Sequence, residues 1–182
     1  TKQPSFRLVK LDSFTGEGLG GCTFRIARIA DGTHYLDRVT DSNGEINISD
    51  LEPGVYSVQE TKAAEGYVID PTEYHVELFP GQTSELVVSN DRKPNLEIIK
   101  TDAVTGAPVE GVTFTVKRVD SSTLTTVKSD AEGKALIEKL DPGVYEVWEQ
   151  SVPDNYLLNE EHQLITLEPN RTGTVHFQNY PK

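Results

Sequence analysis

The sequence lacks disulfide partners, clusters of basic residues and long apolar runs. A single cysteine among 182 residues excludes internal disulfide bonds. The 17 basic residues are outnumbered by 29 acidic ones, for a net charge of −12, which argues against binding to nucleic acid or to an anionic membrane surface. No apolar run approaches the length of a membrane span, and no signal peptide opens the sequence.

Signatures of catalytic and metal sites are also missing. The four histidines, at positions 34, 75, 162 and 176, have no ligand spacing, so we expect no metal site and no cofactor. No nucleophile elbow, phosphate loop or dinucleotide fingerprint is present. The stretch DSNGEINISD, residues 41–50, favours a hairpin turn over a calcium loop. Cys22 is interpreted as a small buried apolar residue and not as a reactive thiol.

What the sequence does contain is an internal repeat of about 90 residues. Each copy carries a lysine, a glutamate and an asparagine in matching sequence contexts. These residues are Lys10, Glu60 and Asn90 in the first copy and Lys100, Glu149 and Asn179 in the second. The asparagine follows the glutamate by 30 residues in both copies. The repeat predicts two domains, residues 1–92 and 93–182, each large enough to bury its own core.

Similar linkers precede the two copies, KQPS before Phe6 and RKPN before Leu96. We therefore expect the chain to be a segment of a longer protein, with neighbouring repeats of the same chain as its first partners. The two halves are equally acidic, so neither is set apart by its charge.

Short segments rich in Val, Ile, Tyr, Phe and Thr, separated by turn residues, predict strands throughout. In the first copy they are residues 6–11, 22–29, 44–51, 54–60, 73–78 and 84–90. In the second they are residues 96–101, 112–119, 134–140, 143–149, 162–167 and 173–179. No segment has a helical period over several turns, so the expected fold class is all-β, with a β-sandwich in each copy.

Alternation along these strands places all three polar residues on apolar faces. Lys10 continues the face of Leu8, and Glu60 continues that of Val58. Burial of an unpaired ammonium or carboxylate is costly and favours the neutral form. One solution is a buried Lys–Glu ion pair with a hydrogen-bonded asparagine. The other is chemical: a neutral lysine attacks the carboxamide, a carboxyl group moves the protons, and ammonia leaves.

The surrounding residues resemble the collagen-adhesin B-type domain, also called the SpaA-type or prealbumin-like domain, of Gram-positive surface proteins and pilins. In the first copy the matching residues are Lys10, Asp12, Thr15, Gly16, Gly21, Phe24, Asp41, Gly44, Leu51, Pro53, Gly54, Tyr56, Val58, Glu60, Tyr67 and Asn90. In the second they are Lys100, Asp102, Thr105, Gly106, Gly111, Phe114, Asp130, Gly133, Leu140, Pro142, Gly143, Tyr145, Val147, Glu149, Tyr156 and Asn179. The resemblance covers essentially the whole chain.

The resemblance implies two tandem immunoglobulin-like (prealbumin-like) β-sandwich domains whose first and last strands are adjacent. It also implies an autocatalytic Lys–Asn isopeptide bond in each domain. Lys10 and Lys100 are then the amines, Asn90 and Asn179 the acceptors, and Glu60 and Glu149 the catalytic carboxyl groups. Asp91 is a weaker candidate acceptor, because alternation places it on the opposite face.

The leading functional hypothesis is a structural stalk or spacer in a cell-wall-anchored, extracellular surface protein or pilin. No multiple-turnover enzyme is expected, since the only chemistry predicted is intramolecular. The alternative is an adhesin module that binds a host matrix protein or glycan through its loops or through Trp148, which aligns with Gln59. Packing under a loop or against the neighbouring domain is the commoner role for such a tryptophan. The terminal Lys182 fits an ordinary linker and, more weakly, a pilin lysine joined by a sortase.

Overall fold

The chain divides into two compact units, Thr1–Arg92 (unit 1) and Lys93–Lys182 (unit 2). The computed structural model describes residues 2–32 and 35–182, so His34 lies outside the described residues. Both units consist mainly of strands joined by turns, and the expected all-β fold class, with a β-sandwich in each unit, is confirmed. In the described part of the chain, no helix is long and apolar enough to cross a membrane.

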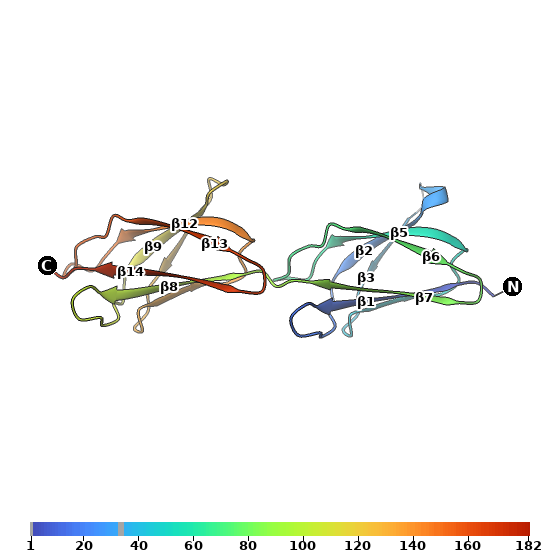
Figure 1. The fold of residues 1–182 in the computed structure, drawn as a ribbon, viewed down its shortest axis with the longest axis horizontal. Helices are drawn as coiled ribbons and strands as arrows, with labels where there is room; N and C mark the ends of the chain where they lie inside the picture. Colours follow the sequence, from blue (N-terminus) through green and yellow to red (C-terminus); the bar gives the residue numbers. More distant parts are fainter. Residues whose placement is uncertain (1, 33–34) are drawn as a thin grey trace. The chain divides into compact units, whose positions relative to one another are not determined.

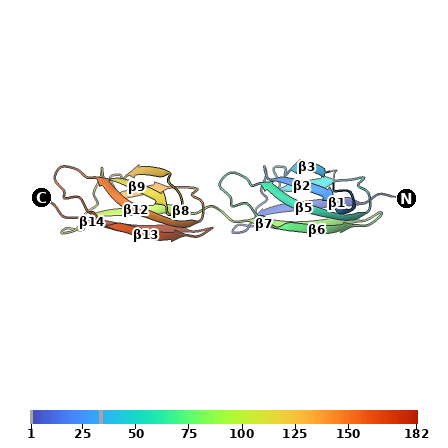
Figure 2. The same ribbon diagram turned by 90° about the horizontal axis from the view of Figure 1, so that it is seen from above.

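Unit 1 is a sandwich of a three-stranded and a four-stranded sheet. Its strands are β1 Ser5–Asp12, β2 Thr23–Arg28, β3 Tyr35–Val39, β4 Glu45–Ile48, β5 Gly54–Lys62, β6 Glu73–Leu78 and β7 Thr83–Asn90. The smaller sheet has the order β4-β1-β7, and the larger has the order β3-β2-β5-β6. In Figure 1 β1 and β7 lie side by side, and Figure 2 shows the four strands of the larger sheet in that order.

Unit 2 repeats this arrangement strand for strand. Its strands are β8 Asn95–Asp102, β9 Thr113–Arg118, β10 Leu124–Lys128, β11 Lys134–Ile137, β12 Gly143–Ser151, β13 His162–Leu167 and β14 Thr172–Asn179. The sheets have the orders β11-β8-β14 and β10-β9-β12-β13.

The first and last strands of each unit pair in parallel. In unit 1 Lys10 is opposite Val88, and Asp12 is opposite Asn90. In unit 2 Lys100 is opposite Phe177, and Asp102 is opposite Asn179. The lysine and the asparagine of each unit are therefore diagonal neighbours on adjacent strands, within reach of a long side chain.

Apolar side chains from the two sheets fill the space between them in each unit. The core of unit 1 includes Phe6, Leu8, Phe24 and Val58, and that of unit 2 has its own buried cluster. β1 alternates strictly between half-buried and buried positions. Lys10 is on the buried face of this strand and is fully buried. The alternation of the strand therefore places a lysine at a position where apolar residues are expected.

The structure adds one strand per unit that the sequence analysis missed, β3 and β10. Nearly all their residues are exposed, and β3 and β10 each lie at the edge of their sheet. An edge strand with little burial has no apolar alternation to reveal it. A short 3₁₀ helix at Ile29–Asp31 also replaces the end of the predicted 22–29 strand.

Candidate functional site

In unit 1 the predicted triad comes together between the two sheets. Lys10 comes from β1, Glu60 from β5 and Asn90 from the end of β7. The Lys10 Nζ atom lies 3.4 Å from Glu60 Oε2. The carboxamide Nδ2 of Asn90 donates a hydrogen bond of 2.9 Å to Glu60 Oε1. One carboxyl group therefore lies between the amine and the carboxamide.

Unit 2 has the same three side chains in a slightly different arrangement. Asn179 Nδ2 donates to Glu149 Oε1 at 2.8 Å. The amine of Lys100 donates to the backbone oxygens of Thr101, at 2.8 Å, and Phe177, at 3.4 Å. Phe177 lies two residues before Asn179 on β14. The amine of Lys100 therefore lies against the strand that carries the carboxamide.

A local irregularity of the strand follows the glutamate in both units. The pairing of β5 with β2 shifts register next to Glu60, which lies opposite Phe24. The pairing of β12 with β9 shifts in the same way after Glu149, which lies opposite Phe114. A bulge of this kind bends the strand and ends its regular pairing beside the site. The glutamate is thus the last inward-facing residue of each strand before the bulge.

Burial sets the electrostatics of the site. Both lysines are fully buried, and both glutamates are 4% exposed. In unit 2, burial lowers the pKa of Lys100 to about 8, against the attraction of Glu149 and Asp102. Burial also raises the pKa of Glu149, although hydrogen bonds from Asn179 and Asn159 oppose it. Burial therefore shifts the pKa values of both groups in the direction that favours their neutral forms.

Several polar atoms of the two triads have no hydrogen-bond partner among the described residues. They are Lys10 Nζ and Glu60 Oε2, which face each other as an ion pair at 3.4 Å, and Glu149 Oε2 and Asn179 Oδ1. Buried polar atoms without partners are rare in folded proteins and cost free energy. All four atoms belong to the two triads, and no other buried side-chain nitrogen or oxygen among the described residues lacks a hydrogen-bond partner. The polar atoms of the two triads are therefore incompletely hydrogen-bonded in the interior.

A second polar cluster, which sequence reasoning did not assign a role, borders the site of unit 1. Asp12 accepts hydrogen bonds from the backbone of Phe14 and Thr15, from the Tyr67 hydroxyl at 2.6 Å and from Arg92 Nε at 2.8 Å. Burial alone raises the pKa of Asp12, but the bonds from Tyr67 and Arg92 overcome this and hold it well below its usual range.

Unit 2 repeats the core of this cluster. The Tyr156 hydroxyl donates to Asp102 at 2.9 Å, and the backbone of Val104 and Thr105 donates to the same carboxylate. The Asp and Tyr positions were both part of the motif quoted from the sequence, but their mutual contact depends on how a loop meets the end of the first strand of each unit.

The remaining candidate residues lie at the margins of the triads or away from them. Cys22 is fully buried, and its Sγ lies 3.9 Å from Asn90 Oδ1. Asp91 is exposed and accepts a hydrogen bond from the Ser13 hydroxyl, so its side chain points away from Lys10. The residues that the structure describes include no group of three or more His, Cys, Asp or Glu side chains suited to holding a metal ion.

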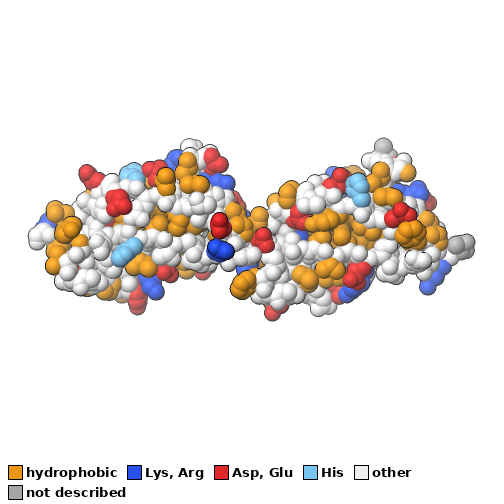
Figure 3. Space-filling view, viewed as in Figure 1, with side chains coloured by type: hydrophobic (Ala, Val, Ile, Leu, Met, Phe, Trp, Pro, Cys, Tyr) orange, Lys and Arg blue, Asp and Glu red, His pale blue; other side chains and the backbone are white. Residues whose placement is uncertain are grey.

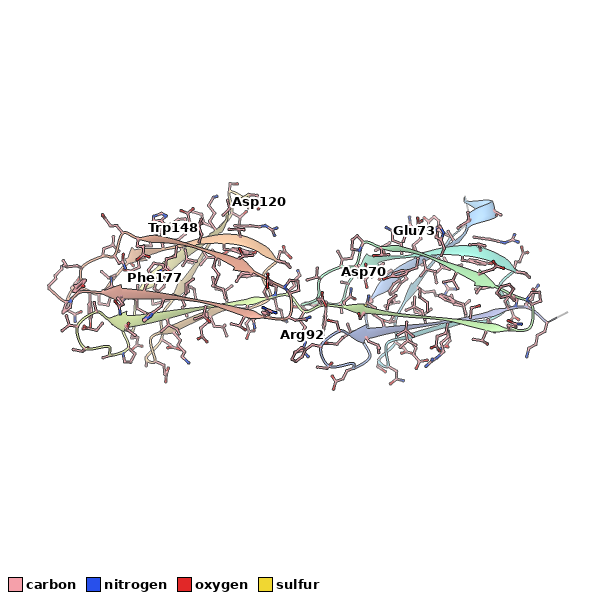
Figure 4. All side chains as sticks on the ribbon, viewed as in Figure 1. Asp70, Glu73, Arg92, Asp120, Trp148 and Phe177 are labelled. Carbon is pink, nitrogen blue, oxygen red and sulfur yellow. The ribbon has the colours of Figure 1, made fainter. Side chains whose placement is uncertain are left out.

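Trp148 lies on the outer face of β12 in unit 2 (Figure 4). Its ring stacks on that of His162 in the neighbouring strand, with ring centroids 4.8 Å apart and planes 5° from parallel. His162 in turn contacts Glu146 through Nδ1 at 2.7 Å. One face of the indole is therefore covered by its own unit. On the molecular face seen in Figure 3, acidic and basic side chains are scattered and form no large basic patch.

Comparison with known protein families gives one match for each unit. The family described as SpaA, a prealbumin-like fold domain, matches residues 4–92 and 94–181. No curated protein matches the chain.

Solved structures with similar folds include pilins of Gram-positive bacteria. The TIE protein of Bacillus anthracis is 26% identical with a TM-score of 0.53, over 99% of this chain and 34% of its own. A streptococcal ancillary pilin is 23% identical with a TM-score of 0.52, over 100% of this chain and 63% of its own. The shaft pilin SpaA of Lactobacillus rhamnosus GG is 17% identical with a TM-score of 0.59, over 100% of this chain and 98% of its own. The chain thus spans about a third of the first of these proteins and less than two thirds of the second.

Proposed function

The chain belongs to the SpaA family of prealbumin-like fold domains, and from this membership we propose that it is a stalk segment whose two units are each closed by a Lys–Asn isopeptide bond. The observation that carries the proposal is the repeated contact between glutamate and asparagine. In both units the carboxamide donates to the glutamate, at 2.9 Å and 2.8 Å, beside a fully buried lysine on the adjacent strand.

In unit 1 the two oxygens of Glu60 face the two reacting groups. Oε2 is next to the Lys10 amine, and Oε1 accepts from the Asn90 carboxamide. The neutral amine attacks Cγ of Asn90, and the bond from Cγ to Nδ2 breaks. The proton lost by the amine passes through Glu60 to the departing nitrogen, which leaves as ammonia. One secondary amide and one ammonia are formed from one amine and one carboxamide, with no other reactant.

Unit 2 follows the same course with Lys100, Glu149 and Asn179. Its lowered lysine pKa increases the fraction of neutral amine near pH 7, which is the nucleophilic form. The raised pKa of Glu149 suits a group that must hold a proton between its two transfers. The reaction also removes a buried amine, so the cost of keeping it in the interior disappears.

Each bond closes a loop of roughly 80 residues, for which the chain-entropy treatment of cross-links gives about 4–5 kcal/mol of stabilisation. Such a gain suits a protein that is exposed to proteases and has no disulfide bonds. We place the segment outside the cell, in a surface protein or pilin anchored to the cell wall. Its role there is to hold other parts of that protein away from the surface.

Intact-mass measurement of the folded chain tests the proposal. Because two ammonia molecules are lost, the mass should fall short of the sequence mass by roughly 34 Da. Peptide mapping should then find Lys10 joined to Asn90 and Lys100 joined to Asn179. The full sequence mass after folding would exclude the cross-links, and a single ammonia loss would restrict the chemistry to one unit.

Glu60→Ala provides the internal control for this measurement. It removes the proton carrier of unit 1 and leaves unit 2 unaltered, so the mass deficit should halve to roughly 17 Da. Formation of the Lys10–Asn90 bond at the normal rate in this variant would remove Glu60 from the mechanism.

A further inference from the structure

A short loop segment in each unit touches both the carboxamide and the glutamate of the triad. In unit 1 this is residues 67–70, between β5 and β6. The backbone oxygen of Val68 accepts a hydrogen bond of 2.9 Å from Asn90 Nδ2. The backbone N–H of Asp70 donates to Glu60 Oε1 at 2.9 Å. One stretch of main chain thus holds the group that leaves and the group that carries its proton.

Residues 156–159 make the same two contacts in unit 2. The backbone oxygen of Leu157 accepts from Asn179 Nδ2 at 2.8 Å. The backbone N–H of Asn159 donates to Glu149 Oε1 at 3.2 Å. The side chains differ at all three positions after the tyrosine, Val-Ile-Asp in one unit and Leu-Leu-Asn in the other. The shared contacts are therefore made by main-chain atoms, and the position of the main chain is what they require.

The tyrosine that begins each segment ties it to the strand that carries the lysine. Tyr67 donates to Asp12, and Asp12 is the last residue of β1, two positions after Lys10. A second tie runs from the N–H of Val68 to the backbone oxygen of Asp91, next to Asn90. The loop is thus fastened to both strands that the isopeptide bond would join.

Unit 2 has the same fastening, with Tyr156 donating to Asp102 and the N–H of Leu157 donating to the oxygen of Tyr180. Neither tyrosine is fully buried. Their rings pack against the apolar cores, whereas their hydroxyl groups bind the carboxylates of Asp12 and Asp102.

We propose that Tyr67 and Tyr156 are positioning residues for isopeptide formation, each locking the loop that orients the carboxamide and the glutamate. This inference rests on the proposed function. With Nδ2 held by two acceptors, the plane of the carboxamide is fixed, and so is the face of Cγ that the amine attacks. A displacement of about 1 Å between reacting groups can slow a reaction about a hundredfold. The tyrosine acts through the main chain and does not touch the reacting atoms.

The experiment follows ammonia loss in time. Chains of the full segment are made in a short cell-free synthesis pulse, and their mass is recorded at intervals, with peptide mapping to assign each bond. In Tyr67→Phe, which keeps the ring and removes the hydroxyl, the Lys10–Asn90 bond should form roughly tenfold to a hundredfold more slowly. The Lys100–Asn179 bond should form at its normal rate, and Tyr156→Phe should show the reverse pattern.

Tyr56→Phe is the matched control. Tyr56 also lies in unit 1 and loses one hydroxyl hydrogen bond on substitution, the 2.7 Å bond to the backbone oxygen of Glu52. The hydroxyl group of Tyr56 forms this bond with Glu52 and not with the triad or with residues 67–70. A purely structural role for Tyr67 predicts that both substitutions affect unit 1 alike, whereas positioning predicts slower bond formation in Tyr67→Phe alone.

A spectroscopic measurement separates orientation from stability. In a Lys10→Met background, which cannot react, the two carboxamide protons of Asn90 should exchange slowly with water because both are hydrogen-bonded. Tyr67→Phe should speed their exchange, and Tyr56→Phe should not. Equal rates of ammonia loss in the wild type and Tyr67→Phe would overturn this inference alone. Absence of ammonia loss in the wild type would overturn the proposed function and this inference with it.

Discussion

At the scale of single residues, the two triads show how burial places a lysine amine beside a glutamate and an asparagine in a protein interior. The sequence predicted that these residues share a buried region, since alternation along three strands placed them on apolar faces. It could not predict that the amine of Lys10 faces Glu60 while that of Lys100 faces backbone oxygens. That difference depends on the side-chain rotamer, which packing from several strands decides together.

The lowered pKa of Lys100 gives a prediction for the pH dependence of bond formation in unit 2. Only the neutral amine attacks, and its fraction grows as the pH rises toward the pKa of about 8. The rate should rise roughly tenfold per pH unit well below this value and level off above it. Chains from a short synthesis pulse, transferred to buffers of increasing pH, would show this by mass. A rate that kept rising toward pH 10, as for an ordinary lysine, would contradict the lowered pKa.

At the scale of strands and turns, the sequence was most informative where one face of a strand is buried. The strands that carry the triads were predicted close to their observed bounds because apolar residues alternate along them. The exposed edge strands β3 and β10 lack that pattern. The Tyr67–Asp12 contact joins a loop to the end of β1, and their meeting depends on the assembled sandwich, so no local pattern could reveal it.

Gly44 shows how closely a turn approaches the reactive strand. It has a φ of +81°, and a Cβ there would lie 2.4 Å from the backbone oxygen of Lys10. Gly16 has a similar φ of +76°, but a Cβ would meet nothing within 4 Å. Gly16→Ala should therefore cost only the strain of a positive φ, about 1 kcal/mol. Gly44→Ala should destabilise unit 1 by roughly 2–4 kcal/mol, because the turn must also move away from β1.

Denaturant unfolding of the two variants would measure the difference. The pair Gly133→Ala and Gly106→Ala repeats the comparison in unit 2. A Cβ on Gly133 would lie 2.3 Å from the Lys100 backbone oxygen, whereas one on Gly106 would meet nothing within 4 Å. An equal loss of unfolding free energy within each pair would show that the turn moves freely and that its close approach to the strand does not contribute to the destabilisation.

At the scale of the whole molecule, each unit has the separate core and sheets of an independently folding domain. Each has its own buried cluster, its own pair of sheets and its own triad. Unit 1 ends at Arg92 and β8 begins at Asn95, so only Lys93 and a buried Pro94 separate the two. The repeat in the sequence was sufficient to predict two modules, because similar segments recur in the same order. We therefore propose that the two units unfold independently.

Lys100→Met tests this independence. Methionine keeps an unbranched side chain of similar length and removes the amine, so unit 2 should fold without its bond. Its melting transition should fall by roughly 20 °C or more if the cross-link contributes about 4–5 kcal/mol. The transition of unit 1 should stay in place, and Lys10→Met should give the opposite result. Calorimetry and trypsin digestion would report both. A joint shift of both transitions would show that the units are coupled.

The parallel pairing of the first and last strands has a consequence for how far the segment can stretch. The chain enters unit 1 along β1 and leaves it along β7, and the proposed bond joins these two strands directly. An unlinked unit that came apart under a pulling force would release the roughly 80 residues between Lys10 and Asn90, about 270 Å of extended chain. A linked unit cannot lengthen in this way, because the bond keeps the residues between Lys10 and Asn90 out of the path of the force. A row of linked units would therefore keep a nearly constant length under a pulling force and would transmit that force along the chain.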